Sequence, residues 1–223
     1  MKKASQLIFD LSRPPAYSVA DFLPAPCNEV AMGWIERWPD WPGLNLALAG
    51  PAACGKSHLA HIFADKSGSV VVPAAELTPD NIPDIADDHG VVVEDADHDV
   101  DETALFHLYN LQKEQGRALL LTGREPPNRW TIALPDLRSR LATLPVAEIG
   151  SPDDFLLEAL LVKLFADRQL RIGPDVIAYA LPRIDRSFAA AHDLVRKLDE
   201  AALEGGRAVT VPLVRAVLDA EVE

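Results

Sequence analysis

Residues 50–57 carry two glycines, a lysine and a serine at the spacing G-x-x-x-x-G-K-S. The glycines let the backbone curl until successive N–H groups face an anion. Lys56 would supply a positive charge to nucleotide phosphates, and Ser57 a hydroxyl to a metal ion. An apolar run precedes the segment and an apolar helix start follows it, as a phosphate-binding loop requires. We therefore expect a nucleotide to bind here, at Gly50, Pro51, Ala52, Ala53, Cys54, Gly55, Lys56, Ser57 and His58.

Two carboxylates, Glu94 and Asp95, follow the apolar run 91–93. Beside a phosphate loop, one acid holds the metal and the next orients or deprotonates the attacking water. We expect Glu94 to join Ser57 as a Mg²⁺ ligand and Asp95 to act on water. Two acids that cap a turn are the simpler alternative.

Three further residues could complete such a site. Thr122 ends the run 118–121 and could sense the γ-phosphate, although threonine also favours strands for its own sake. Arg140, in the pair with Arg138, could be donated to a neighbouring subunit's nucleotide. Arg186 precedes a predicted helix and could fold over the phosphates. The alternatives are solvated arginines and, for Arg186, a surface ion pair with Asp185 or Asp193.

Short apolar runs alternate with amphipathic segments up to Gly150, a pattern that predicts a parallel α/β sheet. Beyond Gly150 only helical spacing appears, with Ser151 and Pro152 as a helix start. We thus expect a tail over 1–15, a nucleotide-binding α/β domain over 16–150 and a helical domain over 151–223. The expected strands are 44–49, 70–72, 91–93, 118–121 and 144–149, and the expected helices are 28–38, 56–64, 102–115, 136–141, 152–168, 174–181, 187–203 and 211–221. In the first helix we expect Asn28 as the N-cap and Val30, Met32, Trp34 and Ile35 partly inward.

The chain has 223 residues and a net charge of −13. Such a surface repels nucleic acid unless a basic patch intervenes, and residues 67–112 contain no lysine or arginine. No apolar run approaches the ~20 residues that span a bilayer, and the start of the chain lacks the core of a secretory signal. Two cysteines make no disulfide framework. These features predict a cytoplasmic protein without membrane partners.

An apolar island, Gln6-Leu7-Ile8-Phe9-Asp10-Leu11, interrupts the polar start of the chain. It could be a peptide that docks on a partner or an edge strand on the chain's own core. The residues themselves leave both interpretations open.

The ordered set of phosphate loop, acidic strand end, polar strand end, paired arginines and helical domain resembles the AAA+ ATPases. Three segments are similar to stretches of the replication initiator DnaA and, more so, of the family of its regulatory inactivators, Hda. These segments are 105–110 (LFHLYN), 121–127 (LTGREPP) and 134–141 (LPDLRSRL).

The resemblance implies an AAA+ parallel sheet with a helical lid, which binds ADP or ATP with Mg²⁺. It implies that Arg140 completes a composite site with DnaA and promotes hydrolysis of the ATP bound by DnaA. It also implies docking on the DNA polymerase β sliding clamp, where Gln6 would hydrogen-bond and Leu7, Phe9 and Leu11 would fill apolar subsites. DNA would be met only through the clamp, since the sequence ends just after the expected lid. A homo-oligomer and the choice between ADP and ATP stay open.

Two positions depart from the initiator pattern. Glu94-Asp95 stands where two aspartates are usual, so the resemblance does not imply ATP hydrolysis by this chain. Arg124-Glu125 stands where Asp-Arg is usual, which leaves phosphate sensing to Thr122. The alternative functions are an ATP-hydrolysing helicase loader or DnaA paralogue that acts on DNA, and a scaffold with a vestigial nucleotide site.

Overall fold

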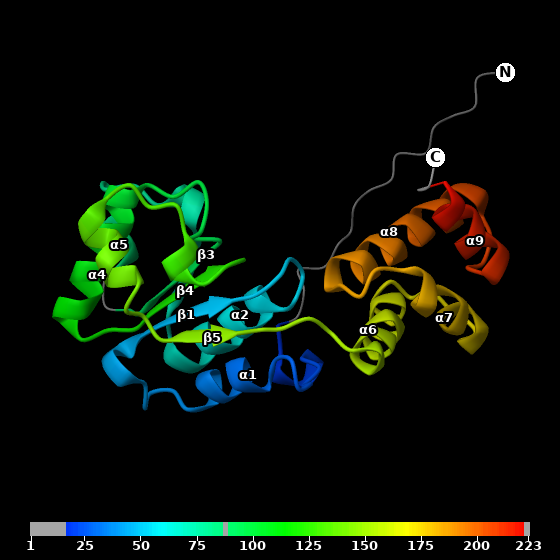
Figure 1. Cartoon of the computed structure of the whole chain (residues 1–223), viewed down its shortest axis with the longest axis horizontal. Helices are drawn as coiled ribbons and strands as arrows, with labels where there is room; N and C mark the ends of the chain where they lie inside the picture. Colours follow the sequence, from blue (N-terminus) through cyan, green and yellow to red (C-terminus); the bar gives the residue numbers. More distant parts are fainter. Residues whose placement is uncertain (1–16, 87–88, 221–223) are drawn as a thin grey trace, which may run out of the picture.

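The computed structural model describes residues 17–86 and 89–220 (Figure 1). The segment predicted to dock on the clamp, with Gln6, Leu7, Phe9 and Leu11, lies outside the described residues, as does the whole of the predicted tail over 1–15. In Figure 1 an α/β part and a purely helical part lie end to end, joined after β5. No helix among the described residues is long and apolar enough to cross a membrane.

Five parallel strands form one sheet in the order β2-β3-β4-β1-β5. The interior strand β1, between β4 and β5, is buried along its whole length, which explains its continuous apolar sequence. The predicted parallel sheet is thereby confirmed. The strands are β1 Asn45–Ala49, β2 Val70–Pro73, β3 Val91–Glu94, β4 Leu119–Gly123 and β5 Val146–Glu148.

Helices cover both faces of this sheet. On one face α1 and α2 pack through Ile35, Leu59 and Phe63, and on the other α3, α4 and α5 pack through residues such as Leu105 and Leu137. These helices are α1 Glu29–Glu36, α2 Lys56–Ser67, α3 Ile82–Ile85, α4 Glu102–Gln115 and α5 Pro135–Leu141, with short 3₁₀ turns at Val19–Asp21, Pro42–Leu44, Ala74–Glu76 and Pro127–Arg129.

Two expectations for α1 are wrong, the inward position of Val30 and the capping role of Asn28. Val30 is 62% exposed, because the helix buries Ala31 and Ile35 against the sheet and Val30 lies off that face. Asn28 precedes the helix without capping it: its Oδ1 accepts from Ala25 N (2.9 Å) and its Nδ2 donates to Leu23 O (2.9 Å). The buried amide therefore holds the preceding loop.

The helices after β5 have a core of their own, built from residues such as Leu161, Phe165 and Leu198. Asp153 rather than Ser151 caps the first helix, since its Oδ1 accepts from Leu156 N (2.8 Å). The helices are α6 Asp154–Asp167, α7 Pro174–Ala180, α8 Phe188–Gly205 and α9 Val211–Asp219, with a 3₁₀ turn at Leu181–Arg183. This confirms the predicted C-terminal helical lid.

Candidate nucleotide-binding cleft

The phosphate loop runs from the end of β1 into α2, as its sequence predicts. Lys56, the first residue of α2, is only 8% exposed, and its Nζ donates to the carbonyl oxygens of Gly50 (2.9 Å) and Pro51 (3.1 Å). An ammonium has three donors, so one is left after these two bonds. Gly55 precedes Lys56 at φ +96°, a conformation that L side chains rarely adopt. The loop therefore encloses a lysine at the positive end of a helix, a geometry that suits phosphate.

Close packing fixes the start of this loop. A Cβ on Gly50 would lie 2.8 Å from Cys54 Sγ and 3.0 Å from Cβ and O of Ile149. Cys54 is itself buried, and burial raises the pKa of its thiol. At neutral pH the thiol is therefore protonated and acts as a packing group under the loop.

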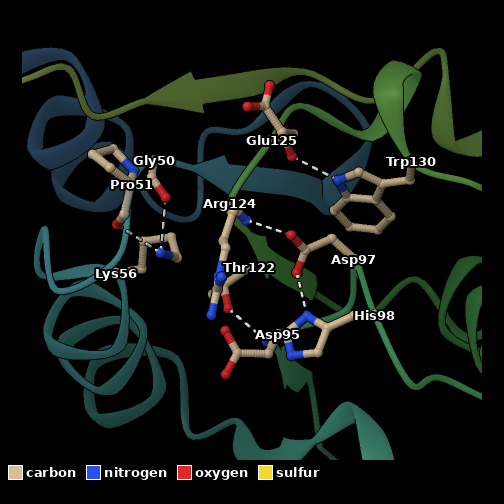
Figure 2. A network of polar contacts seen from close by, with 10 residues as sticks. All are labelled: Gly50, Pro51, Lys56, Asp95, Asp97, His98, Thr122, Arg124, Glu125 and Trp130. Carbon is tan, nitrogen blue, oxygen red and sulfur yellow. Dashed lines mark hydrogen bonds and ion pairs between the residues drawn. The ribbon is translucent and has the colours of Figure 1, made fainter.

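The predicted acids lie beside the loop at the end of β3, and the two differ in position. Asp95 is exposed and lines the cleft together with Lys56 and Ser57. Glu94 is half-buried, and its Oε1 is buried without a hydrogen-bond partner among the described residues. Thr122 Oγ1 accepts from Asp95 N (3.0 Å), so the threonine joins the ends of β3 and β4 (Figure 2).

A Mg²⁺ ion fits this donor set. The unpartnered Glu94 oxygen can accept a metal ion or a metal-bound water, and Ser57 offers a hydroxyl from α2. Among the described residues no three His, Cys, Asp or Glu side chains form a metal cluster. The remaining ligands would be phosphate oxygens and water, which is how Mg²⁺ is usually held at phosphate sites.

Aromatic rings form the wall of the cleft beside the start of α2. The His58 ring makes edge contacts with Tyr17 and Phe22, at centroid distances of 5.5 and 5.4 Å, and Tyr17 stacks on His61 at 4.0 Å. His58 Nε2 donates to Ser18 O (2.7 Å), which ties the first described residues to α2. Burial, and then the charge of Glu94, raises the pKa of Tyr17.

The helical part closes the opposite side of the cleft. Leu156 and Leu160 of α6 and Phe188 and His192 of α8 line it together with the phosphate loop. The cleft has a volume of about 1260 Å³ and combines charged groups at the loop with apolar and aromatic walls. Sites that hold a planar base and a phosphate chain need this combination.

Two predicted arginines, Arg186 and Arg140, are not among the residues that line this cleft. Arg186 forms a two-pronged ion pair with Asp154, at 2.8 Å (Nε to Oδ1) and 2.9 Å (Nη2 to Oδ2). Arg140 lies on α5, its guanidinium carbon 5.0 Å from the ring centroid of Phe106 and 5.5 Å from that of Tyr109. In Figure 1 α4 and α5 lie at the end of the α/β part farthest from the helical part.

The structure adds cleft residues that the sequence did not single out. Arg124, Tyr17 and His192 all line it. No local pattern marks these residues, because each reaches the cleft through the packing of a different segment. Only the departure at Arg124 from the initiator pattern could have drawn attention to one of them.

Comparisons with known proteins agree with this architecture. Residues 156–218 match the family model described as Hda, lid domain. Domain III of the Thermotoga maritima replication initiation protein DnaA is similar, with a TM-score of 0.75 and 17% identity over 93% of this chain and 97% of that one. AMPPCP-bound DnaA from Aquifex aeolicus has a TM-score of 0.61 and 16% identity over 86% of this chain and 68% of that one.

The RuvB Holliday junction branch migration motor of Thermotoga maritima shares the fold as well. Its TM-score is 0.63, with 17% identity over 87% of this chain and 66% of that one. These structural likenesses establish the AAA+ fold, and the family match covers the helical part. Residues 156–218 are thus similar to the Hda lid domain, and they follow an α/β domain whose fold is that of DnaA domain III.

Proposed function

We propose that this protein is a DnaA-related regulator of replication initiation that binds ADP or ATP with Mg²⁺ in the cleft and promotes ATP hydrolysis by DnaA. The observation that carries the proposal is an Hda-family lid closing over a complete phosphate loop. The inner face of the lid and the loop would hold the nucleotide between them. One AAA+ neighbour, DnaA of Aquifex aeolicus, was solved with AMPPCP bound.

The position of Arg140 supports a role in a partner's site. It lies on α5, outside the residues that line the chain's own cleft, and rests on two aromatic rings that limit its freedom. A preordered arginine at the edge of a AAA+ domain is suited to complete the nucleotide site of a neighbouring subunit. Such arginines contribute about 10³–10⁵ in rate in well-measured phosphoryl-transfer systems. Docking on the β sliding clamp through Gln6–Leu11 would bring the protein to replicating DNA.

The test is the ATPase activity of DnaA in the presence of DNA-loaded clamp and this protein. Arg140→Ala should abolish the stimulation and leave nucleotide binding by the variant unchanged, because Arg140 lies outside its own cleft. The matched control is Arg138→Ala, since Arg138 lies on the same short helix and its side chain donates to Ile132 O (3.3 Å). If Arg140→Ala stimulates the DnaA ATPase as well as the wild type does, Arg140 does not complete the site of DnaA.

A clamp pull-down with a variant that lacks residues 1–11 tests the docking step. If the intact chain itself fails to bind the clamp, the result would favour the alternative function, an ATP-hydrolysing helicase loader. That alternative requires DNA-stimulated ATP hydrolysis by this chain. The acidic stretch over residues 67–112, without lysine or arginine, argues against direct contact of that surface with DNA.

A further inference from the structure

The turn after β4 is held on both sides. The backbone N–H of Arg124 donates to Asp97 Oδ2 (2.7 Å), and Trp130 Nε1 donates to Glu125 O (2.6 Å) (Figure 2). Trp130 also packs directly on the turn, because a Cβ on Gly123 would lie 2.8 Å from its Cζ2 atom. The backbone from which the Arg124 side chain projects is therefore fixed.

The Arg124 side chain points into the nucleotide cleft. It is exposed and lines the cleft with Lys56 and Asp95. Figure 2 shows its guanidinium extending toward Thr122 and Asp95, away from the Asp97 carboxylate that binds its backbone. Because β4 lies between β3 and β1, Arg124 projects between the acid that ends β3 and the loop that follows β1.

The chemistry of this side chain is that of a phosphate ligand. A guanidinium is always charged and presents donors in a planar fork that matches phosphate oxygens. In the part of the chain that the structure describes, the Arg124 guanidinium forms no hydrogen bond or ion pair with another residue. A fixed backbone thus presents an uncommitted cation to the phosphate end of the cleft.

We propose that Arg124 binds the terminal phosphate of a nucleoside triphosphate held in this chain's own cleft. The proposal rests on the nucleotide binding proposed above and adds a discriminating contact to it. The phosphate loop and Lys56 enclose the inner phosphates, whereas the acid at the end of the adjacent strand faces the γ-phosphate in sites of this kind. Arg124 lies on the side of Asp95, so it distinguishes a triphosphate from a diphosphate.

Calorimetric titration of the full chain with a non-hydrolysable ATP analogue and with ADP, each with Mg²⁺, tests this assignment. Arg124→Ala should weaken binding of the ATP analogue about 10–100-fold, because a pair of charged hydrogen bonds is lost. Binding of ADP should weaken less than about threefold. Arg124→Lys should retain part of the preference for the ATP analogue over ADP. The control is Arg129→Ala, because Arg129 follows the same turn, pairs with Glu125 (2.9 Å) and is not a lining residue of the cleft.

Three outcomes would overturn the role of Arg124: an unchanged analogue affinity in Arg124→Ala, an equal loss for both nucleotides, or the same loss in Arg129→Ala. Arg124→Gln keeps the length and polarity of the side chain, so it gives the same comparison if the alanine variant does not fold. If the wild-type chain binds neither nucleotide, the proposed function fails at the cleft itself, and the two failures are thus distinguished.

Discussion

Gly50 has no space for a side chain. Its Cβ would stand 2.8 Å from Cys54 Sγ and 3.0 Å from the backbone oxygen of Ile149. We expect Gly50→Ala to lower the free energy of unfolding by about 1–3 kcal/mol, the usual cost of overpacking. It should also weaken nucleotide binding, because Gly50 O accepts from Lys56 Nζ (2.9 Å) and any shift of the loop moves that lysine. Urea unfolding and ADP titration measure the two effects.

Gly33→Ala is the matched control for that substitution. Gly33 lies inside α1, and nothing stands within 4 Å of the Cβ it would gain. Alanine favours a helix interior over glycine by about 0.5–1 kcal/mol, so this variant should be slightly more stable and bind ADP normally. If Gly50→Ala is as stable as Gly33→Ala, the loop can shift to accommodate the added methyl group, which would contradict the prediction.

At the scale of residues, the sequence predicted what depends on local pattern. The spacing of Gly50, Gly55, Lys56 and Ser57 was sufficient to predict the phosphate loop, because the loop forms within one contiguous segment. The ion pair of Arg186 with Asp154 was not predictable, since it joins α6 to the turn before α8. Docking by Gln6, Leu7, Phe9 and Leu11, metal binding by Glu94 and catalysis by Asp95 stay predictions.

The start of α4 determines where α5 begins. The Glu102 carboxylate accepts from Ala133 N (2.9 Å) and Leu134 N (2.6 Å), the residues just before α5. The adjacent Asp101 caps α4 by accepting from Thr103 N (2.8 Å) and Ala104 N (2.9 Å). Since α4 also carries the rings beneath Arg140, one helix positions both the arginine and the helix that bears it.

We therefore expect Glu102→Ala to reduce stimulation of the DnaA ATPase although Arg140 is intact. Two backbone N–H groups lose their acceptor, which frees the entry to α5 and increases the motion of the arginine. Nucleotide binding should be unaffected, since Glu102 is not among the lining residues of the cleft. ATPase assays of Glu102→Ala and of Glu114→Ala, which removes an exposed carboxylate from the same helix, provide the comparison. Equal stimulation by the two variants would contradict this positioning role.

The sequence predicted the bounds of some elements better than those of others. The interval for α4 was correct at both ends, because Asp101 and Gly116 are evident start and stop residues. By contrast β5 is limited to Val146–Glu148 although apolar residues flank it. Leu144 is buried in a bend before the strand, and Ile149 is buried just after it, where its N–H still donates to Ala49 O (2.8 Å). A run of apolar residues cannot show where the strand begins and ends among such positions.

The cleft and Arg140 lie in different parts of the molecule. Its nucleotide cleft lies between the α/β part and the lid, whereas Arg140 lies at the far end (Figure 1). Because α6 and α8 line the cleft, we expect the position of the lid to depend on whether a nucleotide is bound. A ligand present at 100 times its dissociation constant would stabilise the closed arrangement by about 2.7 kcal/mol. A nucleotide bound in this cleft would thus act as a structural link between the two parts.

His192 gives this junction a dependence on pH. It lines the cleft from α8, where burial, and then the charges of Arg168 and Lys163, lower its pKa. As pH falls through about 6.5, the ordinary pKa of histidine, the unfolded chain binds the proton first, so this residue makes folding stability decrease toward acid.

The expected result is that His192→Gln loses less thermal stability than the wild type between pH 7 and about pH 5.5. Glutamine cannot take up the proton, so the component of the pH dependence that comes from this site disappears. His107→Gln, which removes an exposed histidine from α4, should keep the wild-type slope. Melting temperatures recorded in steps of pH measure all three proteins. A steeper loss in His192→Gln than in the wild type would mean that the lid accepts the charged imidazolium, which would contradict its burial between two cations.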